Sequence, residues 1–101
     1  MASKQELLDF LDKHVFHRIL HASERDLGTR QREDLEDLKK RTQDEMGRFH
    51  GYDSAAKVVD MYKADLHSEA ARPVNARLQD LGLPRLVDVR EEFLKLAGEG
   101  A

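Results

Sequence analysis

Three histidines near the start of the chain, His14, His17 and His21, are the side chains with the most evident chemical potential. His17 and His21 are four residues apart, a spacing that places two side chains on one face of a helix. Two imidazoles held in this way form a workable pair of zinc ligands, although zinc needs a third or fourth ligand. The candidates for those further ligands are His50, His67, Glu24 and Glu69.

The same histidines have a second interpretation that involves no metal. At about 100° per residue, they form one stripe with Phe10 beside the apolar face of the first helix. Histidine is commonly half buried, and a pair at helical spacing is a weak signal of a metal site. Di-iron bundles need Glu-x-x-His motifs, and no glutamate stands three residues before any of the five histidines. We therefore favour a boundary stripe and expect no cofactor, with His17 and His21 kept as the metal-ligand candidates.

The elements that must position these side chains are helical throughout. Apolar residues recur every three or four positions, and no stretch alternates with period two between turn signals. The pattern predicts an all-α fold, a small bundle of three long helices with a short C-terminal helical hairpin. We expect one helical domain over residues 1–97 and a flexible tail over 98–101.

The first two helices have clear boundary signals. Ser3 and Glu6 form a capping box ahead of a helix expected over about 4–22. Thr29 is the expected N-cap of a second helix over about 30–50, which Gly51 ends. Opposite charges four residues apart, among them Asp37 with Arg41, support this second helix.

The remaining helices are less regular. The apolar seam of the second helix is thin, and Thr42 and Glu45 interrupt it. The third helix is capped by Asp53 or Ser54 and ends or bends at Pro73, which lacks an amide hydrogen. Two short helices follow, from Val74 to Leu81 and from Pro84 to about Leu96, separated at Gly82.

Composition excludes several classes of function. The 101-residue chain is 40% hydrophobic and 37% charged, with a formal net charge of −3. It contains no cysteine, which removes disulfides, thiol catalysis and iron–sulfur clusters. No apolar run is long enough to cross a bilayer, and the N-terminus lacks the apolar core of a secretory signal. We expect a cytoplasmic protein that has no membrane contact and is not a dedicated nucleic-acid binder.

Catalysis and DNA binding have little support. The serines stand at caps or on helix surfaces without a nucleophile elbow, and no glycine-rich phosphate loop is present, so we expect no enzyme. Residues 74–96 resemble a helix-turn-helix in outline. However, the three basic residues of its second helix are balanced by three acidic ones, whereas a recognition helix is normally basic. Four arginines in and just before this segment could still line one edge: Arg72, Arg77, Arg85 and Arg90.

The first helix is apolar on more than one side, which bears directly on function. Phe10, Phe16 and Leu20 fall outside its main apolar stripe. Surplus apolar surface of this kind usually marks a contact, most often with a second copy of the chain. The alternative is that the C-terminal pair of helices folds back over Phe16 and Leu20. We favour a non-catalytic protein–protein interaction module of unknown pathway that forms a homodimer or binds another protein. A histidine-based metal- or haem-binding bundle is the alternative, and a small DNA-associated regulator is third.

Overall fold

The computed structural model describes residues 2–98 and has an all-α fold, with no strand in that range. Its principal extents are 43 × 21 × 19 Å. The elements in chain order are α1 (Lys4–Leu11), the π-helical η1 (Asp12–Phe16), α2 (His17–Leu20), α3 (Thr29–His50), α4 (Ala55–Leu66), α5 (Ala71–Asp80), the 3-10 helix η2 (Leu86–Val89) and α6 (Arg90–Leu96).

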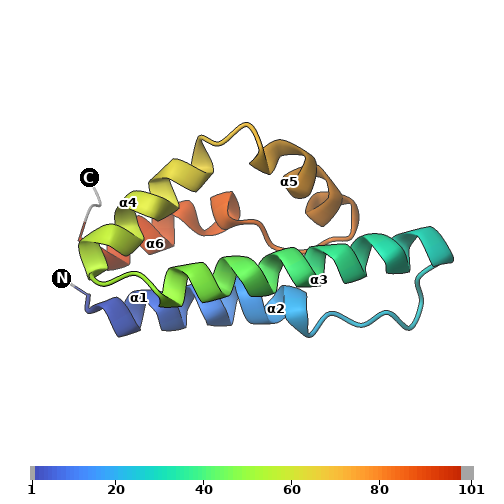
Figure 1. Ribbon diagram of the computed structural model, residues 1–101, viewed down its shortest axis with the longest axis horizontal. Coiled ribbons are helices and arrows are strands. Elements are labelled where there is room, and N and C mark those ends of the chain that lie inside the picture. Colours follow the sequence, from blue (N-terminus) through green and yellow to red (C-terminus); the bar gives the residue numbers. More distant parts are fainter. Residues whose placement is uncertain (1, 99–101) are drawn as a thin grey trace.

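The helices form a long base and an arch above it (Figure 1). The base consists of α3 and the continuous helix α1–η1–α2, which lie side by side. The arch consists of α4 and α5, which rise away from the C-terminal end of α3 and return toward its other half. The last segment, η2 and α6, runs back under α4 to contact α1.

Local signals in the sequence set most helix boundaries. Ser3 Oγ accepts a hydrogen bond from the amide of Glu6 at 3.1 Å, and Glu6 Oε1 accepts one from the amide of Ser3 at 3.3 Å, which confirms the capping box. Ser54 Oγ caps α4 by accepting from the amide of Lys57 at 3.1 Å. The N-cap of α3 is Gly28 rather than Thr29, since Thr29 is already the first helical residue.

The first helix contains a π-helical segment that the periodicity did not predict. The amide of His17 donates to the carbonyl of Asp12, five residues back instead of four. The wider turn holds one extra residue, so the residues that follow are rotated backward by about 100° relative to a regular α-helix. Side chains on the two sides of η1 therefore do not follow a single helical wheel.

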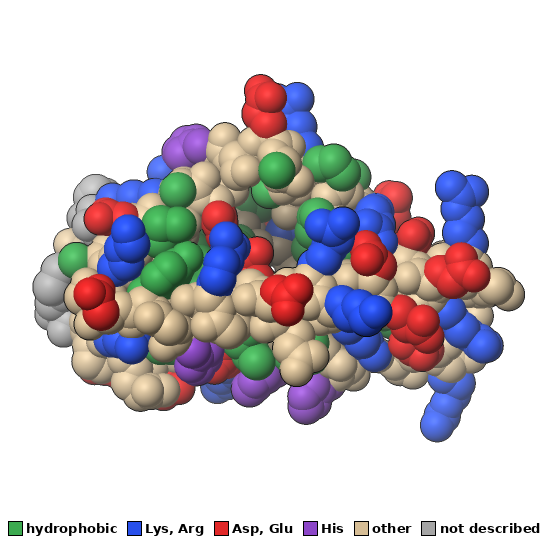
Figure 2. Space-filling view, in the orientation of Figure 1, with side chains coloured by type: hydrophobic (Ala, Val, Ile, Leu, Met, Phe, Trp, Pro, Cys, Tyr) green, Lys and Arg blue, Asp and Glu red, His purple; other side chains and the backbone are tan. Residues whose placement is uncertain are grey.

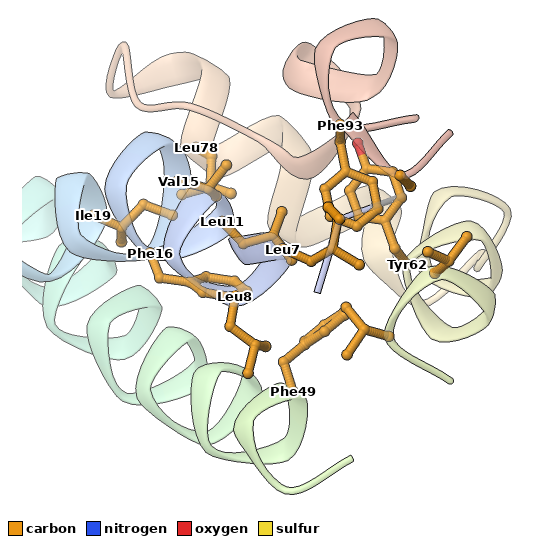
Figure 3. Close-up of a cluster of buried hydrophobic side chains, with 14 of the residues drawn as sticks. Leu7, Leu8, Leu11, Val15, Phe16, Ile19, Phe49, Tyr62, Leu78 and Phe93 are labelled. Atoms are coloured by element: carbon orange, nitrogen blue, oxygen red, sulfur yellow. The ribbon is translucent and has the colours of Figure 1, made fainter. Parts of the chain in front are cut away.

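Phe16, the last residue of η1, does not lie on an outer face as the sequence predicted. The side chain is 2% exposed and packs against Phe49, with the ring centroids 5.8 Å apart. Figure 3 shows it within the buried cluster, together with Val15 and Ile19 from the same helix. Fully burying a phenylalanine side chain contributes about 1.5–3 kcal/mol, which helps to offset the less regular hydrogen bonding of the π turn. The observed burial shows that Phe16 is not part of a surplus outer face.

The C-terminal half departs from the sequence prediction in three places. The third helix ends at Leu66, before Pro73, and Pro73 lies in the first turn of α5, where proline is tolerated. The helix expected from Pro84 begins as the 3-10 turn η2 and becomes α-helical only at Arg90. Gly82 has a φ of 69°, a left-handed conformation that suits glycine at the turn after α5. Of the expected flexible tail over 98–101, residues 99–101 lie outside the described residues.

Aromatic packing attaches the last segment to the base. The rings of Tyr62 in α4 and Phe93 in α6 are stacked with centroids 4.1 Å apart, and both residues are fully buried (Figure 3). The Tyr62 hydroxyl donates to the carbonyl of Leu86 in η2. Phe10 of α1 also contacts Phe93, with the ring centroids 6.0 Å apart. Phe10 is thus half buried by the returning C-terminal segment.

The far end of the arch is fixed to α3 by one arginine. Arg77 of α5 donates to the Asp37 carboxylate at 3.0 Å and to the backbone carbonyl of Asp34 at 3.1 Å. Arg41 donates to the same Asp37 carboxylate, also at 3.0 Å, which confirms the ion pair expected within α3. These contacts hold the end of the arch above the N-terminal half of α3. Within residues 2–98, no helix is both long and apolar enough to cross a membrane.

Candidate functional site

A cavity of about 300 Å³ lies between the base and the arch. Figure 2 shows the hollow above α3 and below α4 and α5. Its walls come from η1, α2, α3, α4, α5 and η2, so nearly every element contributes to it. The apolar part of the lining consists of Val15, Phe16, Ile19, Leu66, Val74, Leu78, Leu86 and Val87, with Ala70 and Ala71. A ligand with an apolar body would meet side chains that are held rigidly by the core on their other side.

Polar groups are concentrated on the wall that α3 and the end of α4 provide. Glu45, Arg48 and Asp65 line the cavity together there. Arg48 Nη2 is 2.9 Å from Glu45 Oε1 and 3.8 Å from Asp65 Oδ2, so one guanidinium nitrogen serves both carboxyl groups. We call these three side chains the acidic corner. Thr42, one turn before Glu45 on α3, is the only buried polar residue in the described part of the chain.

The carboxyl groups of the acidic corner are poorly satisfied. Glu45 Oε1 and Asp65 Oδ2 are buried, and neither accepts a hydrogen bond. The approach of Arg48 to Glu45 is an ion pair without the geometry of a hydrogen bond. Buried acceptors without donors are uncommon in proteins and call for an explanation at each occurrence. Neither side chain is fully covered, since Glu45 keeps 29% of its side-chain surface accessible and Asp65 keeps 21%, and both residues line the cavity.

Burial and, after it, the hydrogen bond and repulsion with Asp65 together raise the pKa of the Glu45 carboxyl to about 8, against a smaller lowering by Arg48. Two carboxyl groups that share a site cannot both ionise without repulsion, so one of them holds a proton. At neutral pH the acidic corner therefore contains one shared proton and one cation. Strongly shifted pKa values in a cleft are a common property of functional sites.

The histidines that attracted attention in the sequence lie elsewhere. In Figure 2, most of the histidine side chains in view gather along the lower edge of the molecule, away from the hollow. The rings of His17 and His21 are 5.6 Å apart, and both side chains are exposed. His14 is half buried against Phe10 instead, with ring centroids 4.5 Å apart. The π turn has divided the expected single stripe into two pairs.

A metal site needs more ligands than this arrangement provides. No group of three or more histidine, cysteine, aspartate or glutamate side chains in residues 2–98 is placed to hold a metal ion. His17 and His21 are near each other, but His50, His67, Glu24 and Glu69 do not join them in such a group. The metal- or haem-binding alternative therefore gains no support from the geometry.

The arginine edge that could face DNA is partly occupied. Arg77 is held by Asp37, and Arg85 forms an ion pair with Asp88 at 2.7 Å. The expected second helix of the helix-turn-helix is broken into η2 and the short α6. These contacts reduce the positive charge available along that edge, so the geometry adds nothing to the DNA-associated alternative.

The histidine with a tertiary partner is His50, at the end of α3. Its Nε2 lies 2.8 Å from Asp12 Oδ2, which joins α3 to the π turn of the first helix. The Asp12 side chain is only 13% exposed, while His50 is 40% exposed. The other carboxyl oxygen of Asp12 is buried without a hydrogen-bond partner. The contact with His50 therefore provides much of the hydrogen bonding of a largely buried carboxylate.

We expect His50→Ala to lower the free energy of unfolding by about 1–3 kcal/mol at pH 7, because it leaves the Asp12 carboxylate buried and unpaired. Urea denaturation measures the change. The matched control is His17→Ala at an exposed histidine, for which we expect a change within about 0.5 kcal/mol. Equal effects of the two substitutions would show that the Asp12 contact contributes nothing to stability.

The sequence contained little indication of the polar residues that line the cavity. Thr42 and Glu45 interrupt the apolar seam of α3, and a polar position within such a seam is the signal that could have indicated a site, although no site was predicted from it. Asp65 gave no comparable signal. Its proximity to Glu45 depends on how α4 leaves the end of α3.

Comparison of the chain with protein-family models, with curated proteins and with solved structures found no match.

Proposed function

We propose that this chain is a non-catalytic helical binding module, and that the cavity between α3 and the α4–α5 arch receives a small molecule with an apolar body. The observation that carries the proposal is the combination of apolar walls with one polar corner. Ligand sites typically consist of such walls with a few placed polar groups, and about 300 Å³ is the lower end of their usual volume range. At about 30 Å³ per water-sized group, the cavity has room for about ten non-hydrogen atoms.

Binding accounts for the lining better than catalysis does. The residues that line the cavity include neither a histidine nor a cysteine, the side chains that most often supply a general base or an activated nucleophile at neutral pH. The carboxyl groups have a cation beside them, and the hydroxyl side chains of the lining, Thr42 and Ser68, do not donate to Glu45 Oε1 or to Asp65 Oδ2. The acidic corner therefore supports recognition of a ligand rather than its transformation.

The homodimer was predicted from surplus apolar surface on the first helix, and the structure does not expose that surface. Phe16 is buried in the core of a single chain, and Phe10 and Leu20 are half buried. Val87, 42% exposed at the cavity, is the only large hydrophobic residue that is exposed among those described. A stable protein interface buries about 800 Å² on each partner, and one exposed valine does not indicate such a surface. The homodimer stays a prediction, and the proposed ligand is a small molecule.

A panel of hexyl compounds with cationic, neutral and anionic head groups tests the proposal: hexylammonium, 1-hexanol and hexanoate. We expect at least one of them to shift the methyl resonances of Val15, Ile19 and Leu78, which line the cavity. Ala71→Leu places a larger side chain in the lining and should lower the affinity of that compound at least tenfold. The matched control is Ala76→Leu, an exposed position of the same helix outside the lining, which should leave the affinity unchanged. If none of the three compounds shifts these methyl groups, the proposed function is wrong.

A further inference from the structure

We infer that the ligand carries a cationic amine. Its ammonium group binds at the acidic corner, while its apolar body lies against the cavity walls formed by η1, α2 and α5. This inference rests on the proposed function, because it names the class of molecule that the cavity receives. The observations that carry it are the position of Glu45 and Asp65 in the cavity, their unsatisfied oxygens and the balance of charge around them.

The two carboxyl groups can face one ligand atom together. Glu45 Oε1 and Asp65 Oδ2 both lie within 4 Å of the same nitrogen of Arg48. They come from different helices, and both residues line the same cavity. An ammonium group has three donors and no acceptor. It can therefore donate to both carboxyl groups in place of the proton that they share, because Arg48 makes no hydrogen bond to Glu45 Oε1 or to Asp65 Oδ2.

Charge favours a cation over an anion at this position. The charged residues that line the cavity are Arg41, Glu45 and Arg48 from α3 and Asp65 from α4. The other walls, formed by η1, α2, α5 and η2, contribute no charged residue. Arg41 is held by Asp37, outside the lining. With both carboxyl groups ionised, the acidic corner has two negative charges and one positive charge. A bound monocation makes it neutral, whereas a carboxylate would face two acids and compete with them for Arg48.

Binding then takes the form of an exchange. In the free protein the carboxyl pair retains a proton, consistent with the raised pKa of Glu45. When the ammonium group enters, that proton leaves for solvent and the ammonium takes over the compensation of charge. No covalent bond forms or breaks apart from the carboxyl O–H, and the ligand keeps its own protons. Because one proton is released on binding, the apparent affinity increases about tenfold for each unit by which the pH rises, as long as the pH is below the pKa of the site.

The experiment compares hexylammonium, 1-hexanol and hexanoate by methyl chemical-shift titration at pH 6, 7 and 8. An alkylammonium with a pKa near that of lysine, about 10.4, stays charged throughout this range. At pH 8 we expect hexylammonium to bind at least tenfold more tightly than either of the other compounds. We expect its affinity to increase about tenfold per pH unit between pH 6 and 8, while the affinity for 1-hexanol does not change.

Two variants locate the effect. Glu45→Gln should lower the affinity for hexylammonium at pH 8 at least tenfold and remove its dependence on pH. Asp44→Asn removes the same charge from the preceding residue of α3, which is exposed and outside the lining. This control should change neither the affinity for hexylammonium nor its dependence on pH. Asp65→Asn repeats the test from α4, so that a misfolded variant at one position does not decide the outcome. Thermal melting confirms that each variant is folded before titration.

The outcomes separate this inference from the proposed function. If 1-hexanol or hexanoate binds as tightly as hexylammonium, the cavity is a binding site but the amine is not its ligand class. If hexylammonium is preferred and the preference is unchanged in both Glu45→Gln and Asp65→Asn, the ammonium group binds elsewhere and the inference is overturned. If no compound binds, the proposed function has failed first.

Discussion

Phe16→Ala is expected to lower the free energy of unfolding by about 3–5 kcal/mol, the usual cost of removing a buried phenylalanine ring. The side chain is 2% exposed, and its ring packs against Phe49 from α3. Removing it separates the π turn from α3 and enlarges the neighbouring cavity. Urea denaturation measures the loss. The matched control is Val87→Ala, at the exposed rim of the same cavity, for which we expect a change within about 0.5 kcal/mol.

The same substitution decides whether Phe16 belongs to a core or to an interface. The ring is covered within one chain, so the unfolding midpoint of the parent protein should not change with protein concentration. An obligate dimer would behave differently, because dilution would lower its midpoint. A concentration-dependent midpoint that Phe16→Ala abolishes would place Phe16 between two copies and restore the homodimer predicted from the sequence.

Glu45→Gln is expected to increase the free energy of unfolding by about 1–3 kcal/mol at pH 8.5 and to leave it nearly unchanged at pH 5. The pKa of Glu45 is about 8 in the folded chain, compared with 4.5 for the unperturbed group. The folded state therefore binds a proton more tightly than the unfolded state. The resulting contribution to stability is complete below pH 4.5 and is lost as the pH rises through 8. Glutamine has no charge to bury, so the variant avoids this loss.

The magnitude follows from the shift and the exposure of the side chain. Each pKa unit corresponds to about 1.4 kcal/mol. The 29% of the side chain that stays accessible lets water screen the effect, so only part of the full amount should be measured. Asp44→Asn on the exposed face of α3 is the control and should show no such dependence on pH. A stabilisation by Glu45→Gln that is equal at pH 5 and pH 8.5 would mean that the Glu45 carboxyl is ionised across the whole range.

Short-range signals predicted the helices well. Ser3 with Glu6 and Ser54 with Lys57 cap helices through contacts three residues apart, and Asp37 pairs with Arg41 one turn away. Interactions of this kind are complete within one or two turns, so local sequence is enough to define them. The same reasoning failed at Pro73, because proline is tolerated in the first turn of a helix as well as after its end.

The candidate site was largely beyond prediction. Thr42 and Glu45 were recognised as interruptions of an apolar seam, but nothing in the sequence connected them with Asp65 on another helix. The histidine stripe was predicted from a regular helical wheel, and one π turn divided it. A helical wheel assumes a constant rotation per residue, and tertiary packing is what makes a single extra residue in a turn favourable.

By itself, the sequence determined that this protein is all-α, where most of its helices begin and end, and which exposed charges pair within a helix. These properties depend on hydrogen bonds and side-chain contacts between close neighbours in the chain. Only the tertiary structure decided that Phe16 belongs to the core, that Asp12 meets His50, and that Glu45 and Asp65 share one cavity. Each of these contacts joins residues far apart in the chain, and its formation depends on the packing of whole helices, which no local pattern specifies.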